Sequence, residues 1–200
     1  MTAIEKEALR KVALAARARL APEERAEASR AALRHLVALE EFARAGTIGI
    51  YAPLGSELDP LALAAPDASS DRRFAFPRMV EGERALAFAI CAPEELVPGA
   101  LGTREPPGRA APLALEELDL VLVPGVAFDL EGGRLGRGRG YYDALLASLS
   151  PRTRRWGLLF EVQLVPRVPR EPHDRPLDGL VTEARSVQCG AGRPARRPIR

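Results

Sequence analysis

The segment from Gly132 to Asp143, GGRLGRGRGYYD, concentrates residue types that bind phosphate groups, and we call it the glycine–arginine segment. Glycines let backbone amides approach an anion closely, and arginine side chains offer forked pairs of N–H donors. The residues that follow, DALLASL, predict a helix, whose N-terminus adds partial positive charge. We therefore predict a phosphate-binding loop, with Asp143 in the first helical turn placed to hold a magnesium ion that bridges the phosphates. The glycines are Gly136, Gly138 and Gly140, and the arginines are Arg134, Arg137 and Arg139.

This segment does not match the common nucleotide-binding loops. The pattern GxxxxGK[ST] is absent from the chain, and alignment to GxGxxG puts Tyr141 in place of the last glycine. A flexible surface turn with solvated arginines would use the same residue types. The five glycines of the segment would then cost chain entropy without serving a ligand, so we favour the phosphate-binding interpretation.

The composition of the chain limits where an anion can bind. The chain has 200 residues, of which 46% are hydrophobic, and this is enough for the core of one domain. Its 29 basic and 27 acidic residues give a formal net charge of +2, too small for a general attraction to nucleic acid or acidic membranes. Any anion site must therefore be local.

Cysteine content and hydropathy favour a cytoplasmic protein. Cys91 and Cys189 are too few and too far apart in sequence for a disulfide framework or a zinc site. The N-terminal residues carry charges at helical spacing, and no later stretch approaches the roughly eighteen apolar residues of a membrane span. We expect a cytoplasmic monomer that does not insert into a membrane.

Hydrophobic periodicity predicts an α/β fold. Two amphipathic helices are expected at residues 3–20 and 22–43, and apolar strands interleaved with helices follow them. This pattern is typical of a mostly parallel central sheet with helices on both faces, a Rossmann-like three-layer sandwich with an N-terminal helical pair. The strands are expected at 47–51, 73–77, 85–91, 118–124, 154–160 and 179–184, and a further helical piece at 60–65.

The chain is expected to form a single domain over residues 1–189. Residues 93–112 are rich in proline and glycine and are expected to be a long ordered loop. Residues 190–200 lack apolar anchors and are expected to be a disordered arginine-rich tail. The glycine–arginine segment follows strand 118–124, so it falls at the carboxyl end of a sheet strand, where open α/β sheets bind ligands.

Several blocks of the sequence resemble the 5-formyltetrahydrofolate cyclo-ligase family, also called methenyltetrahydrofolate synthetases. The run VLVPGVAFDLEGGRLGRGRGYYDALL, residues 121–146, is similar to the family signature. Four other blocks occur in the family's order: KEALR at 6–10, YAPLGSELD at 51–59, GTREP at 102–106 and FEVQLVPRVPREPHDRPLDGLVTE at 160–183. Together the blocks span almost the whole chain, which makes the combined match specific.

The resemblance implies an ATP-dependent and magnesium-dependent ligase. In this family 5-formyltetrahydrofolate becomes 5,10-methenyltetrahydrofolate, and ADP and phosphate are released. The formyl oxygen takes the γ-phosphoryl group first, and N10 then attacks the activated carbon. Phosphoryl transfer needs positioning and charge stabilisation more than a strong base, which agrees with a site of arginines, amides and metal.

The resemblance also assigns roles to residues of this chain. ATP would be bound by Lys6 and Arg10, four residues apart on the first helix, and by Arg134, Leu135, Gly136, Arg137, Gly138, Arg139, Gly140, Tyr141 and Tyr142. The folate would contact Glu57, Arg137, Gly138, Arg139, Gly140 and Tyr141, and the catalytic residues would be Arg137, Arg139 and Tyr141. Magnesium would be held by Asp143 and Asp174.

Taken alone, several of these residues have simpler explanations. Lys6 with Arg10 would form a solvated helix face, Glu57 would be a surface acid and Asp174 a loop cap. The roles of the two adjacent tyrosines could be exchanged.

Two other functions stay open at this point. The arginines, glycines and tyrosines of RGRGYY, together with the basic tail, suit a protein that binds single-stranded nucleic acid. A phosphosugar isomerase or an acyl-transfer enzyme on a related sheet is the second, because one fold hosts many chemistries. A hydrolytic triad is not indicated, since GxSxG is absent and the histidines are His35, on a helix face, and His173, beside Asp174.

Overall fold

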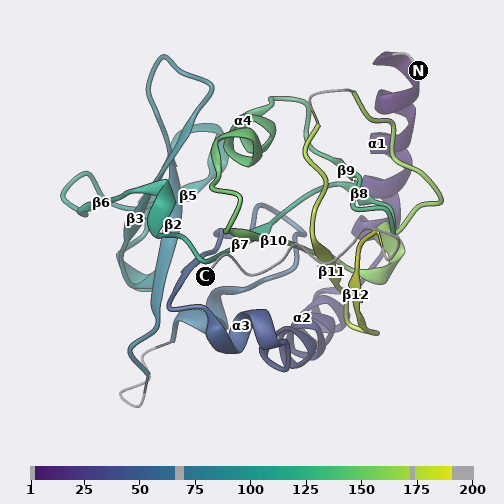
Figure 1. Cartoon of the computed structure of the whole chain (residues 1–200). Helices are drawn as coiled ribbons and strands as arrows, with labels where there is room; N and C mark the ends of the chain where they lie inside the picture. The colour runs from purple at the N-terminus through teal and green to yellow at the C-terminus, as the bar shows by residue number, and fades with distance from the viewer. Residues whose placement is uncertain (1–2, 66–69, 172–173, 191–200) are drawn as a thin grey trace.

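The computed structural model describes residues 3–65, 70–171 and 174–190, and it is built around one eight-stranded sheet (Figure 1). The strand order is β12-β11-β10-β7-β1-β2-β3-β6. The five strands from β11 to β2 run parallel. The outer pairings are antiparallel: β12 with β11, β3 with β2, and β6 with β3. The strands are β1 Thr47–Gly49, β2 Arg73–Met79, β3 Leu86–Ile90, β6 Pro112–Leu113, β7 Leu120–Val123, β10 Arg154–Leu158, β11 Gly179–Val181 and β12 Ser186–Gln188. The mostly parallel sheet predicted from the sequence is confirmed.

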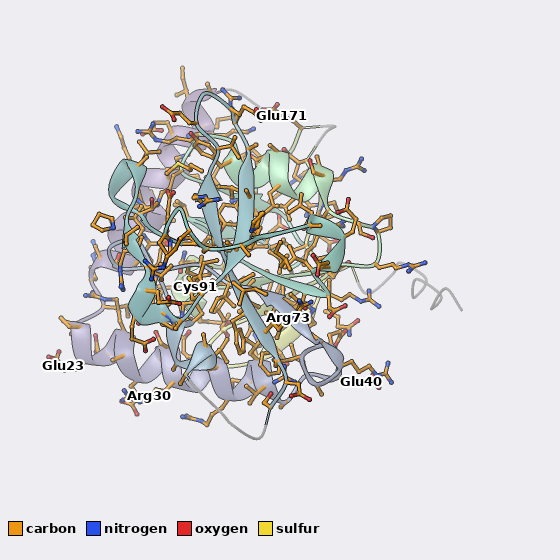
Figure 2. The ribbon with its side chains drawn as sticks, turned by 90° about the vertical axis from the view of Figure 1, so that its left-hand side faces the viewer. Glu23, Arg30, Glu40, Arg73, Cys91 and Glu171 are labelled. Atoms are coloured by element: carbon orange, nitrogen blue, oxygen red, sulfur yellow. The ribbon has the colours of Figure 1, made fainter. Side chains whose placement is uncertain are left out.

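Helices cover both faces of this sheet, as Figure 1 shows with α4 on one side and α2 and α3 on the other. The central strand β7 explains why both faces need cover, since all of its side chains are buried. Leu120 and Leu122 pack in the cluster that contains α2 and α3, whereas Val121 and Val123 pack in the cluster that contains α4. The helices are α2 Pro22–Val37, α3 Glu40–Arg44 and α4 Tyr141–Ser148. Glu23, Arg30 and Glu40 point outward from α2 and α3 into solvent (Figure 2).

The first helix, α1 (Ala3–Ala18), does not share a face with α2. Its buried residue Ala13 packs with Val126, Ala127, Leu135 and Val168. Two of these residues belong to a hairpin of β8 (Ala127–Phe128) and β9 (Arg134–Leu135). The expected pair of N-terminal helices is therefore present in sequence, but each helix packs against a different part of the molecule.

Some predicted boundaries are wrong. The helix expected over 22–43 is interrupted, because α2 ends at Val37 and Leu39 is extended before α3 begins. The helical piece near residue 60 is a short 3₁₀ helix, η1 (Leu61–Ala64). The ordered loop over 93–112 contains a two-stranded ribbon of β4 (Val97–Pro98) and β5 (Arg104–Glu105). The remaining 3₁₀ helices are η2 Pro93–Glu95, η3 Ala100–Gly102, η4 Leu115–Glu117 and η5 Glu161–Gln163.

The strand order places a crevice between β1 and β7. Numbered along the chain, the parallel strands have the order 2-1-3-4-5, which is the flavodoxin-like arrangement rather than the order of a Rossmann dinucleotide domain. The chain leaves β1 toward β2 on one side and later returns to β7 on the other. In such sheets the loops after the two central strands diverge and leave room for a ligand at their carboxyl ends.

Three predictions fall wholly or partly outside the described residues. The predicted arginine-rich tail lies mostly in the region 191–200, which is not described, so both the tail and the division of the chain at residue 190 stay predictions. His173 is also outside the described residues. In the part of the chain that is described, no helix is both long and apolar enough to cross a bilayer.

Candidate active site

A cavity of about 450 Å³ lies at the carboxyl ends of β1, β2 and β7. Its size is in the range of small-molecule sites, and its position is the crevice that the strand order predicts. Its walls come from the loop after β1, the end of β2, the start of β3, residues 101–105 of η3 and β5, the turn after β7 and the glycine–arginine segment. The lining includes Tyr51, Leu54, Glu57, Pro77, Met79, Pro124, Gly125, Arg134, Gly136, Arg137, Arg139, Gly140, Tyr141, Tyr142 and Asp143.

The backbone of the glycine–arginine segment requires glycine at three positions, the first of which is Gly132 at φ +81°. Gly138 has φ +90° and Gly140 has φ +78°, and L side chains rarely adopt this left-handed region. Gly140 is also the N-cap residue of α4, and the Arg84 side chain lies 3.0 Å from where a Cβ on it would be. The segment therefore brings backbone amides and the start of a helix to the same wall of the cavity.

Arg134 connects the end of β7 to the start of α4. Its side chain is only 5% exposed, and it donates a hydrogen bond of 3.2 Å to the carbonyl oxygen of Pro124. It forms an ion pair with Asp143 and lies 5.7 Å from the centre of the Tyr142 ring. The arginine predicted to bind phosphate and the aspartate predicted to bind magnesium are thus partners of one another.

A second ion pair joins the two loops on either side of the cavity. Arg137 donates from Nε and Nη2 to Oε1 of Glu57, at 3.1 and 3.0 Å, and Nη2 also reaches the carbonyl oxygen of Leu54 at 3.1 Å. The other oxygen of Glu57 accepts the Leu54 amide at 3.0 Å. The glutamate side chain is 9% exposed and the arginine side chain 41%, so the arginine is the partner that can move.

Helix α1 reaches the same segment. Arg10 donates from Nε to the carbonyl oxygen of Gly136 at 2.9 Å, and its guanidinium lies 3.5 Å from where a Cβ on Gly138 would be. Lys6 pairs with Glu171, which lies beside the start of α1 at the end of the molecule opposite α2 and α3 (Figure 2). Asp174 accepts the Glu171 amide at 2.7 Å. Of the sequence-predicted site residues, Lys6, Arg10, Leu135, Gly138 and Asp174 lie outside the cavity lining. Gly138 lines a neighbouring hollow, and Leu135 is buried in the cluster that packs against α1, so the predicted contact of Leu135 with ATP is not supported by its position.

Comparison with known proteins decides the family. The model of the 5-formyltetrahydrofolate cyclo-ligase family matches residues 2–183. The chain belongs to this family. It is 32% identical over 147 residues to a 5-formyltetrahydrofolate cyclo-ligase of Mycolicibacterium smegmatis, covering 70% of this chain and 75% of that protein. It is 31% identical over 170 residues to the Escherichia coli K12 cyclo-ligase, covering 83% and 93%.

Solved structures agree with this assignment. The 5,10-methenyltetrahydrofolate synthetase of Aquifex aeolicus superposes with a TM-score of 0.80 at 35% identity, and 96% of each chain is covered. The synthetase of Mycoplasma pneumoniae has a TM-score of 0.71 at 23% identity, covering 89% of this chain and 98% of that one, which supports the fold alone. The cyclo-ligase resemblance seen in the sequence is therefore confirmed.

Two tyrosines form an apolar wall of the cavity in this member of the cyclo-ligase family. Burial, reinforced by the negative charge of Glu57, raises the pKa of Tyr51 and of Tyr142, so both phenols stay protonated at neutral pH. Tyr51 uses its hydroxyl to donate to the Leu58 carbonyl oxygen at 2.8 Å. Tyr142 packs inward against the α4 side of the core, while Tyr141 lines both the cavity and a shallower neighbouring hollow.

Sequence reasoning missed a buried aspartate that shapes the entry to the glycine–arginine segment. Asp129 is 1% exposed, and its carboxylate accepts the amides of Gly133 and Val168 at 2.8 Å and the Arg170 guanidinium at 2.7 Å. The pattern Asp-x-x-Gly-Gly is a turn signal that could have pointed to it.

A buried arginine, Arg17, was also missed. It lies seven residues after Arg10 and eleven after Lys6, a spacing that puts the three cations on one side of a helix. That spacing was the available signal in the sequence.

Proposed function

We propose that this protein catalyses the conversion of 5-formyltetrahydrofolate to 5,10-methenyltetrahydrofolate, with ATP and magnesium, and releases ADP and phosphate. Membership of the cyclo-ligase family supports the reaction. The observation that carries the assignment is the cavity between β1 and β7, where arginines, a glycine backbone and a buried glutamate face the same space. These groups suit a substrate with an anionic phosphate part and an N–H-rich ring.

The reaction proceeds in two steps. The formyl oxygen bonds to the γ-phosphorus as the bond to the bridging oxygen of ADP breaks. N10 then adds its lone pair to the activated carbon, the carbon–oxygen bond breaks, and phosphate leaves while the N10 proton passes to solvent. Both steps move negative charge onto phosphate oxygens, so fixed donors around those oxygens lower the barrier.

The glycine–arginine segment supplies these donors. Arg137 and Arg139 act as the catalytic cations, and the backbone of Gly136 and Gly140 in the cavity, with that of Gly138 in the neighbouring hollow, is available to the phosphates. Tyr141, at the junction of the cavity and the neighbouring hollow, lies beside the formyl region of the folate. Lys6 and Arg10 extend the cationic surface along α1, and Arg10 also holds the carbonyl oxygen of Gly136.

Glu57 binds the ring of the folate. Its carboxylate accepts two N–H groups of Arg137 on Oε1 and the Leu54 amide on Oε2, and a carboxylate with these lone pairs can instead accept the neighbouring N–H donors of a pterin ring. Folate binding therefore competes with Arg137 for Glu57. Arg137 is then released toward the phosphates, where its charge is needed.

The residues fit a magnesium ion carried mainly by the nucleotide. Among the described residues no three histidine, cysteine, aspartate or glutamate side chains gather into a metal site, but magnesium needs only one or two carboxylates when phosphates supply the other ligands. Asp143 is 47% exposed at the start of α4 and lines the cavity, so it would hold the ion. Asp174 lies outside the cavity lining and accepts the Glu171 amide, so its role as a second magnesium ligand stays a prediction. When bound, the ion would neutralise charge on the transferring phosphate.

The near-ultraviolet absorbance of the product tests the reaction. Purified protein is mixed with 5-formyltetrahydrofolate and magnesium, with and without ATP, and the methenyl band is followed. Growth of the band only with ATP, and its loss when a chelator removes magnesium, is the expected result. Folded protein that gives a flat trace with ATP would contradict the proposal.

The variant Asp143→Asn tests the metal assignment separately. We expect it to abolish the response of turnover to magnesium while the free energy of unfolding changes by less than about 1 kcal/mol, because the lost contact is a part-exposed ion pair at a helix start. Unchanged magnesium dependence would remove Asp143 from the metal site.

We also propose that the protein works as a monomer in the cytoplasm and does not bind nucleic acid. The two cysteines form no disulfide, which suits a reducing compartment, and the net charge is only +2, which gives no general attraction to nucleic acid. Light scattering during gel filtration would give the mass of the particle, and a mass of two or more chains would contradict the first point. Retention on single-stranded RNA at low salt would contradict the last.

A further inference from the structure

The guanidinium of Arg17 is buried beneath the cavity, near the end of α1. The residue is 2% exposed, which is unusual because a buried charge loses its hydration and is costly unless the fold satisfies it. Its Nε donates to Oγ of Ser56 at 3.0 Å, and its Nη1 donates to the carbonyl oxygen of Gly125 at 3.4 Å.

These two acceptors belong to the two loops that form the crevice. Ser56 immediately precedes Glu57 in the loop after β1, and Gly125 lies in the turn after β7. Both loops line the cavity, yet Ser56 and Arg17 do not. One side chain on α1 thus holds the two divergent loops together from behind.

The charge of Arg17 also acts on the site. Burial lowers the pKa of Arg17, and the neighbouring Glu57 raises it again, so the glutamate is the nearby negative charge that compensates the buried cation. Glu57 therefore has two cationic neighbours with different freedom. Arg137 lies on the solvent side and is 41% exposed, whereas Arg17 is fixed on the protein side.

We propose that Arg17 is a positioning residue for the folate side of the active site. It holds the Ser56–Glu57 loop against the Gly125 turn, and it leaves Glu57 with a permanent counter-charge when Arg137 moves to the phosphates. This inference rests on the proposed function. It predicts that loss of Arg17 weakens folate binding selectively, because the nucleotide is held mainly by the glycine–arginine segment.

The kinetic test compares Arg17→Met with Arg17→Lys. Arg17→Met is expected to raise the KM for 5-formyltetrahydrofolate by about tenfold or more while the KM for ATP changes by less than about twofold, and Arg17→Lys is expected to recover part of the loss. Arg155→Met is the matched control. Arg155 is a second buried arginine, 6% exposed, but it stands near the amino end of β10, away from the cavity. It should lower stability without changing the ratio of the two KM values.

A second measurement keeps the inference testable if Arg17→Met folds poorly. Ser56→Ala removes one partner of Arg17 without touching the cavity lining, and its effect on the folate KM should not add to that of Arg17→Lys. Amide hydrogen exchange of residues 54–58 and 125–126, measured without substrates, should rise in Arg17→Lys and Ser56→Ala but not in Arg155→Met.

The outcomes separate the two proposals. Wild-type protein without turnover would overturn the proposed reaction, and the exchange data would still report on the loops. If the wild-type protein turns over, an equal rise of both KM values in Arg17→Met would overturn the positioning role. Unchanged hydrogen exchange of the two loops in Arg17→Lys and Ser56→Ala would also overturn it.

Discussion

Gly132 and Gly133 differ from Gly138 and Gly140 in their surroundings, although all four lie within the same short segment. A Cβ on Gly132 would approach the Leu177 carbonyl oxygen to 2.5 Å, and one on Gly133 would approach the Asp129 carboxylate to 2.5 Å. Around Gly138 and Gly140 the nearest atoms belong to arginine side chains, at 3.5 and 3.0 Å. We call the first two the buried pair and the second two the loop pair.

Glycine content alone therefore does not identify a binding loop, because glycines of one segment have different surroundings. The buried pair is enclosed by backbone and by a fixed carboxylate, so its role is to let the hairpin of β8 and β9 close against the residues near 177. The loop pair is bordered by long side chains that can move when a ligand arrives. Changes at the buried pair should therefore affect folding, and changes at the loop pair should affect catalysis.

The largest effect is expected from removing the carboxylate that encloses the buried pair. Asp129→Ala leaves the buried Gly133 and Val168 amides without an acceptor and Arg170 without its partner, which should lower the free energy of unfolding by about 4 kcal/mol. Urea denaturation measures this loss. The exposed Asp71 serves as control, since Asp71→Ala should change stability by less than about 0.5 kcal/mol. Equal losses in the two variants would contradict the buried role.

Gly132→Ala should cost about 3 kcal/mol, because the added Cβ both strains a backbone at φ +81° and collides with a backbone oxygen. Gly82 allows the two causes to be separated. It has φ +75° with no atom within 4 Å of the added Cβ, so Gly82→Ala should cost only about 1 kcal/mol. The difference between the two variants in urea denaturation isolates the collision, and a difference near zero would place Gly132 with the loop pair.

Gly138→Ala should lower turnover strongly but stability only slightly, the opposite of Gly132→Ala. Its added Cβ meets Arg10 at an ordinary contact distance of 3.5 Å, so the stability loss should match the roughly 1 kcal/mol of Gly82→Ala. Turnover per folded molecule should fall by about tenfold or more, because the backbone can no longer follow the phosphates closely. Steady-state kinetics of the methenyl product would show this. Full activity would remove the loop pair from the site.

The smallest expected effect is that of pH on stability through the thiol of Cys189. The Cβ of this residue lies 3.2 Å from where a Cβ on Gly132 would be. Burial, then the charges of Asp129 and Asp178, raises the pKa of this thiol to about 12. Because the folded pKa is the higher one, the thiol stabilises the fold fully below about pH 9 and loses that contribution as the pH rises toward 12.

Urea denaturation between pH 8 and pH 11 measures this loss of stability, and thiol labelling at pH 8 checks the burial of Cys189 that causes it. In a Cys91→Ser background, Cys189 should react slowly in wild type and in Gly138→Ala, and faster in Gly132→Ala, because only the last variant opens the buried pair. Equal rates in the two glycine variants would show that the thiol does not report on the buried pair.

Much of this fold could be predicted from sequence, because the apolar strands carry strong local signals. The run Leu120–Val123 can only be a strand buried on both faces. The break between α2 and α3 has no glycine or proline to mark it, and it arises because Phe42 turns into the core. Strand order could not be predicted, since neighbours such as β1 and β7 are more than seventy residues apart.

The site was predictable to the same extent. The glycine–arginine segment was visible because its residues are contiguous. The bond between Arg137 and Glu57 spans 80 positions and depends on the strand order, so no local pattern contains it. Arg17 looks like one more helical arginine in the sequence, and only the arrangement of the loops around it shows that it is buried.

The packing of α1 has a consequence for how the protein is made. Helix α1 is synthesised before its packing partners Val126, Leu135 and Val168, which follow Ala13 by more than one hundred residues. The helix must therefore wait undocked, with its cations hydrated, until most of the chain has emerged. The active site is then completed at one of the last steps of folding, by a helix that was synthesised before the loops it contacts.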